Sequence, residues 1–134
     1  MSGLAGGAAA PLRAVDTYTA IPDGDGWLLC STLLVRGDDP SLRGHFPGLP
    51  VLPGVFVVEA LGQLMRLALG DGTGAPALRA LTSVRFFAPL LDGDELRLTA
   101  RATAAPGGWS VRAEGRSAAG TVTSRVRAEY GAPC

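Results

Sequence analysis

One apolar segment, Val55–Leu69, limits the folds open to this chain more than any other feature. It has about four turns of good helix formers and is apolar on nearly all faces, which is typical of a buried helix. Pro53-Gly54 stands just before the segment and Gly70 follows it, as expected at the two ends of a helix. Polar residues interrupt the segment, so we expect no membrane span.

Most of the remaining chain is predicted to be β-structure, because apolar and polar residues alternate along it. The expected strands, in chain order, are Trp27–Arg36, Ala80–Ala88, Glu95–Thr103, Trp109–Glu114 and Thr121–Tyr130. The expected turns are Pro22–Gly26, Asp71–Pro76, Leu91–Asp94, Pro106–Gly108 and Ala118–Gly120. Leu12–Ile21 is an amphipathic stretch of either type. Short turns make neighbouring strands antiparallel, with one face exposed to water. The sequence therefore predicts an α+β fold in which one buried helix packs across an antiparallel sheet.

The length and the net charge of the chain limit the number of domains it can form and the classes of ligand it can bind. The 134 residues fit one domain, expected over residues 11–134 after a flexible tail at residues 1–10. The net charge is zero, which argues against binding of nucleic acid or of anionic membranes. Cys30 and Cys134 form no disulfide framework or zinc motif, so we expect a cytoplasmic protein without a metal site.

Two ionisable residues are candidates for chemistry. His45 is the single histidine of the chain and lies in the proline-rich loop Gly37–Pro53, which is long enough to suggest a function. Glu59 lies in the helix, where Gln63 and Arg66 follow on the same stripe. From the helix alone, a structural interpretation of this stripe is favoured over a functional site: a polar edge that faces solvent, or a buried network of Glu59 with Arg66. Gly62, a costly residue in a helix, would be explained by close packing on the sheet.

The joint pattern from Gly44 to Gln63 resembles a known family. The sequence HFPGLPVLPGV, followed by Glu59-Ala60 and Gln63, is similar to the signature HFPGxPxxPGVxxxEAxxQ of the bacterial (3R)-hydroxyacyl-acyl-carrier-protein dehydratases, which are FabZ-like. A weaker likeness covers Arg85–Pro89 and Gly93-Asp94. The resemblance implies a hot-dog fold, in which an antiparallel sheet wraps around one long central helix.

The resemblance also implies an activity and a site. The chain would be a hydro-lyase that converts (3R)-hydroxyacyl groups on an acyl carrier protein to trans-2-enoyl groups and water. Its catalytic residues would be His45 and Glu59. Its substrate-binding residues would be Gly54, Gln63, Phe46, Pro53 and Val55. No metal or separate cofactor is implied, because the substrate is carried on the phosphopantetheine arm of the carrier protein.

The family's histidine and acid usually come from different subunits, so the resemblance implies a homodimer. A trimer of dimers and a heterodimer with another hot-dog subunit remain open. The resemblance implies a role in fatty-acid or polyketide chain assembly. The chain lacks the HRyPF-like element that family members carry before the leucine-rich stretch, which suggests a specialised relative in a polyketide or other secondary pathway. Two alternatives stay open: a non-catalytic partner subunit, and a hot-dog thioesterase. Arg43, Arg79 and Arg85 are candidates for contact with an acidic carrier protein.

Overall fold

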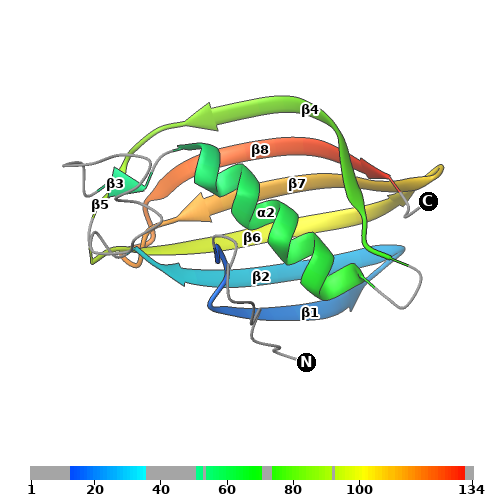
Figure 1. Ribbon diagram of the computed structural model, residues 1–134, viewed down its shortest axis with the longest axis horizontal. Coiled ribbons are helices and arrows are strands. Elements are labelled where there is room, and N and C mark those ends of the chain that lie inside the picture. The colour runs from blue at the N-terminus through cyan, green and yellow to red at the C-terminus, as the bar shows by residue number, and fades with distance from the viewer. Residues whose placement is uncertain (1–12, 36–50, 53, 71–73, 92, 132–134) are drawn as a thin grey trace, which may run out of the picture.

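Eight strands and one helix form the part of the chain that the computed structural model describes, residues 13–35, 51–52, 54–70, 74–91 and 93–131 (Figure 1). The strands are β1 Thr17–Asp23, β2 Gly26–Leu34, β3 Val51–Leu52, β4 Ala77–Phe86, β5 Leu90–Leu91, β6 Glu95–Ala105, β7 Gly108–Arg116 and β8 Val122–Gly131. Six of them form one antiparallel sheet in the order β1-β2-β6-β7-β8-β4, and β3 pairs with β5. The expected antiparallel sheet is confirmed.

Helix α2, Gly54–Leu69, crosses the inner face of the large sheet diagonally (Figure 1). It begins one residue before the expected segment and ends where the sequence predicts. Its sheet-facing side chains are almost fully buried: Phe56, Val57, Ala60, Leu61, Leu64 and Met65. Each apolar side chain removed from water stabilises the fold by about 1.5–3 kcal/mol. The contact between this helix and the sheet therefore forms the main core, as the sequence predicts.

The strands supply the other half of that core by strict alternation. In β6, Leu96, Leu98, Ala100 and Ala102 are at most 1% exposed, while the residues between them face outward. In β8, alternation predicts that Thr123 faces water together with Arg125 and Arg127. This prediction is wrong, because Thr123 is only 3% exposed. The pairing of β7 with β8 shifts register after Gly115, which places both Thr123 and Ser124 inside. Their hydroxyls have no hydrogen-bond partner among the described residues. The alternation of polar and apolar residues could not predict that two consecutive polar side chains are buried here.

Several expected boundaries are wrong by a few residues. The turn expected at Pro22–Gly26 is only two residues long, because Asp23 and Gly26 already pair as strand ends. Gly24 has φ of +60°, as the first central position of a type II′ hairpin turn requires. Residues 51–52, expected in a loop, and residue 91, expected in a turn, belong to the β3–β5 pair. Strand β4 runs over 77–86 rather than 80–88, since its pairing with β8 starts at Ala77.

Residues 1–12 and 36–50 lie outside the described residues, and with them the expected flexible tail and most of the proline-rich loop. Among the described helices, none is both long enough and apolar enough to cross a membrane.

The packing of α2 on the sheet generates a stability prediction. Leu64 is fully buried and Leu67, less than one turn further on, is 39% exposed. Leu64→Ala should lower the free energy of unfolding by about 2–5 kcal/mol, because it leaves a cavity in the core. The matched change Leu67→Ala should cost about 1 kcal/mol or less. Urea unfolding measures both, and equal losses would contradict the orientation of the helix.

Candidate active site

Glu59 lies on the flank of α2 that the sheet does not cover. Its side chain is 45% exposed, so the solvent-facing polar edge that the sequence left open is confirmed for the single chain, and the burial expected from the apolar helix is wrong for Glu59. The reason is geometric, since the apolar stripe facing the sheet leaves the opposite flank open to solvent. Its Oε1 atom accepts a hydrogen bond from Gln63 and lies 3.6 Å from Nη2 of Arg66. The predicted stripe of Glu59, Gln63 and Arg66 is thus confirmed as a contact network.

The Gln63 amide joins the helix to the segment before β1. Its Oε1 accepts a hydrogen bond of 2.7 Å from the backbone N–H of Ala14, and its Nε2 donates one of 3.1 Å to Glu59. Because the amide can satisfy both partners in only one orientation, these two bonds fix its direction. Ala14 and Val15 are themselves buried. The segment before β1 therefore helps to position the carboxyl of Glu59.

Tyr130, on the inner face of β8, lies beneath this network. A Cβ atom placed on Gly62 would be 3.8 Å from the Tyr130 hydroxyl and 3.5 Å from Nη1 of Arg66. Both are ordinary contact distances, so Gly62 is not required by close packing on the sheet, and that expectation is wrong. Burial raises the pKa of Tyr130 to about 12, with Arg66 lowering it and Glu59 raising it. The alternation of β8 placed Tyr130 on this face, but the sequence did not link it to Glu59.

The other predicted site residues are described in part or not at all. Gly54 is the first residue of α2, and Val55 follows it, so the backbone of both belongs to the first turn of the helix. His45, Phe46 and Pro53 lie outside the described residues. Backbone N–H groups in the first turn of a helix have no partner within the helix and, with the helix dipole, favour a negatively charged ligand atom. The described site therefore combines the start of a helix with an oriented carboxyl one to two turns later.

Within the described ranges, no group of three or more histidine, cysteine, aspartate or glutamate residues is arranged to hold a metal ion.

The sheet order and the single long helix on its inner face define a hot-dog fold, confirming the expected fold class. The R-hydratase PhaJ1 of Pseudomonas aeruginosa superimposes with a TM-score of 0.67 at 16% identity, covering 82% of each chain. The dehydratase heterocomplex ApeI:P of Xenorhabdus doucetiae superimposes with a TM-score of 0.64 at 18% identity, covering 85% of this chain and 95% of that one. At such identities the likeness concerns the fold alone.

The sequence defines the family more narrowly. The model of the ApeI-like family, described as ApeI dehydratase, matches residues 28–124, which is more than half of the chain. The protein belongs to the ApeI-like dehydratase family. A 3-hydroxyacyl-[acyl-carrier-protein] dehydratase FabZ from Nitratidesulfovibrio vulgaris is 39% identical over 73 residues, covering 50% of this chain and 47% of the relative. The chain thus matches about half the length of such curated relatives.

The position of Tyr130 generates a prediction about pH. Its phenol should ionise at about pH 12 in the folded protein, against 10.0 for an ordinary tyrosine, chiefly because burial disfavours the charged form. The folded chain then holds this proton more tightly than the unfolded chain. The stabilisation from this group is complete below pH 10 and is lost as the pH rises from about 10 to about 12.

The measurement uses ultraviolet absorbance of the phenolate in a Tyr18→Phe variant, where Tyr130 is the single tyrosine. The same variant in denaturant provides the reference titration. A folded-state midpoint equal to the reference would mean that Tyr130 is in contact with water.

Proposed function

We propose that this protein is a dehydratase acting on (3R)-hydroxyacyl groups carried by an acyl carrier protein, with trans-2-enoyl groups and water as products. Membership of the ApeI-like dehydratase family supports the reaction class. The single observation that carries the proposal is the Glu59 carboxyl, held on α2 by Gln63 at the spacing of the dehydratase signature. The FabZ relatives, named for acyl carrier protein substrates, support the carrier, although they match only about half of this chain.

The chemistry needs an acid, a base and a donor to the thioester oxygen. Hydroxide is a poor leaving group, so Glu59, in its protonated form, donates its proton to the C3 hydroxyl as the C3–O bond breaks, and water leaves. His45, as a neutral imidazole, takes the proton from C2, and the electron pair of that C–H bond forms the C2–C3 double bond. Negative charge that develops on the thioester oxygen is stabilised by the backbone N–H of Gly54 at the start of α2. Phe46, Pro53 and Val55 flank these groups in the sequence and contact the acyl chain.

The working unit in this proposal is a dimer, with His45 of one subunit facing Glu59 of the other. Two observations support it. The first is that Glu59 stands half exposed on the uncovered flank of α2, where a second chain can exclude water. The second is that the edge strand β4 and the residue after it carry four large apolar side chains, each 44–51% exposed: Leu78, Leu81, Phe86 and Phe87. A long apolar edge strand without a partner is an aggregation hazard, so native chains usually cover it.

A second candidate is a heterodimer in which this chain pairs with another hot-dog subunit. The ApeI:P complex, a heterocomplex by its name and similar in fold, favours it. Light scattering and assay separate the two assemblies. An active homodimer supports the first, whereas a chain that is inactive alone and active with a second hot-dog subunit supports the second. A role in polyketide or other secondary-metabolite assembly remains part of the proposal, and turnover of carrier-bound substrates of graded length tests it.

Catalysis by Glu59 and His45 generates a mutational prediction. Purified protein should convert 3-hydroxyacyl carrier protein to the enoyl product, measured by mass spectrometry of the acyl-carrier species. His45→Ala and Glu59→Gln should each lower kcat by about a hundredfold or more, because each removes one of the two proton-transfer groups.

The matched control is Glu129→Gln, the same carboxyl-to-amide change at an exposed position of β8. It should leave kcat and KM unchanged. Full activity in Glu59→Gln would contradict the assignment of the acid. Release of free acid and thiol instead of enoyl product would point to a thioesterase.

A further inference from the structure

The outer face of the sheet, opposite α2, is rich in arginine. Six of the twelve basic residues of the chain project from three adjacent strands, β6, β7 and β8: Arg97, Arg101, Arg112, Arg116, Arg125 and Arg127. We call this set the arginine face. The outward-facing positions of these three strands also carry three glutamates, Glu95, Glu114 and Glu129. Six positive charges against three negative charges leave an excess of three positive charges on this face. The zero net charge of the whole chain conceals this local excess.

Strand register aligns three of these arginines in one row. Arg101 lies directly opposite Arg112, and Arg112 lies directly opposite Arg127. Like charges directly opposite one another in a sheet destabilise it. Arg101 has a carboxylate partner, Asp23, at 3.3 Å. Within the described part of the chain, the guanidinium groups of Arg112 and Arg127 have no ion pair, so two of the three arginines in the row lack a carboxylate partner.

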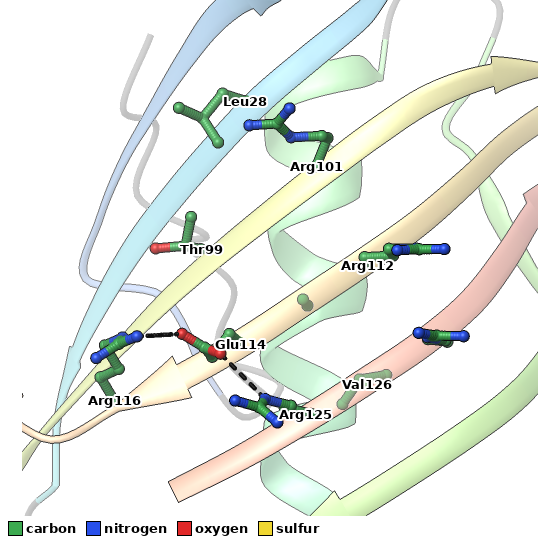
Figure 2. Close-up of a pocket in the computed structure, with 10 residues that line it drawn as sticks. Leu28, Thr99, Arg101, Arg112, Glu114, Arg116, Arg125 and Val126 are labelled. Atoms are coloured by element: carbon green, nitrogen blue, oxygen red, sulfur yellow. Dashed lines mark hydrogen bonds and ion pairs between the residues drawn. The ribbon is translucent and has the colours of Figure 1, made fainter. Parts of the chain in front are cut away.

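Two glutamates lie one row away, Glu114 on β7 and Glu129 on β8, and among the described residues neither forms an ion pair with Arg112 or Arg127. Glu114 accepts hydrogen bonds from Arg125 at 3.1 Å and from Arg116 at 2.9 Å (Figure 2). These two hydrogen bonds lower the pKa of Glu114, so it stays charged and paired. Figure 2 shows its carboxylate between the two arginines, with Arg112 further along the same strand. Glu114 therefore does not neutralise the row.

The row borders a shallow hollow of about 670 Å³ on this face. Five arginines line it, and none of its lining residues is aromatic. The side chains of Arg101 and Arg125 are 63% and 61% exposed, so the hollow is open and suits a broad contact better than an enclosed small molecule. Proteins that bind single-stranded nucleic acid combine a basic groove with aromatic rings on which successive bases stack. Here one ring, that of Phe87, lies 5.6 Å from the guanidinium of Arg125, and none lines the hollow itself. Arginine forks, by contrast, pair with carboxylates through two parallel hydrogen bonds.

The geometry of the row matches the spacing of carboxylates on a helix. Adjacent strands lie about 4.8 Å apart, so the row from Arg101 to Arg127 spans about 10 Å. Glutamates on one face of a helix, at a first position and then four and seven residues later, span about 10.5 Å along its axis. A helix laid across the strands can therefore place one carboxylate against each arginine of the row.

We propose that the arginine face docks an acidic helix of a partner protein, laid across β6, β7 and β8 with its carboxylates against Arg101, Arg112 and Arg127. This surface lies on the side of the sheet opposite Glu59, so the proposal goes beyond the dehydratase function and does not depend on it. A bound acidic helix supplies carboxylates to Arg112 and Arg127, which have no ion pair among the described residues. Its negative charge offsets the repulsion between the arginines of the row.

The test measures binding of a fluorescent alanine-rich helical peptide with glutamates at the three spaced positions, by anisotropy at low salt. Wild-type protein should bind it, and binding should weaken as salt screens the charges. The double variant Arg112→Gln, Arg127→Gln should bind at least about tenfold more weakly, since two charge-assisted contacts are lost. The matched control, Arg13→Gln with Arg66→Gln, removes the same charge on the helix side of the sheet, where both arginines are about half exposed, and should bind like wild type.

Two further readouts keep the test decisive. The double variant should melt at a higher temperature than wild type, because like-charge repulsion in the row is relieved; this also shows that it is folded. A peptide with glutamine at the three positions should not bind. The proposal is overturned if both double variants lose binding equally, if the glutamine peptide binds as well, or if a single-stranded oligonucleotide binds more tightly at the arginine face than the acidic peptide does.

Discussion

The contact between the apolar face of α2 and the inner face of the sheet determines the rest of this structure. Residues at 0% exposure, such as Ala60 and Leu64, fix the rotation of the helix about its axis. Once that rotation is fixed, the polar positions 59, 63 and 66 must fall on the uncovered flank. The location of the candidate acid is thus a consequence of core packing, and no separate interaction is needed to bring Glu59 to the surface of the single chain.

A small polar network then refines what packing has placed. The bond from Ala14 to Gln63 ties the N-terminal segment to the helix, and the bond from Gln63 to Glu59 orients one carboxylate oxygen. Tyr130 lies beneath this network. Its hydroxyl is near Gly62 and Arg66, and the charges of Arg66 and Glu59 act on it. The carboxyl is therefore oriented by this chain alone, while its exposure leaves room for a second chain.

The same sheet carries mutually repelling arginines on its outer face, so the two faces of the sheet differ sharply in chemistry.

Much of this could be predicted from the sequence, because it depends on local periodicity. The apolar run of α2 and the alternation of β6 gave the layer arrangement, and the dehydratase signature gave the family. The sequence could not give what depends on pairing between distant segments. The β3–β5 pair and the register shift that buries Thr123 are fixed by partners far along the chain. The sequence left both a solvent-facing edge and a buried pair open for Glu59, because an apolar segment does not reveal which flank the sheet leaves uncovered. The role of His45 stays a prediction, since that residue lies outside the described part of the chain.

The most direct measurement of the central claim, an active site shared between two subunits, is complementation between two inactive variants. His45→Ala and Glu59→Gln proteins are mixed under conditions where mass spectrometry shows that subunits exchange. A mixed dimer then contains one site with both native residues and one site with neither. With random exchange, the mixture should recover about a quarter of the wild-type dehydratase activity, because half of the dimers carry one intact site of two. A mixture that exchanges subunits and stays as inactive as either variant alone would contradict the account.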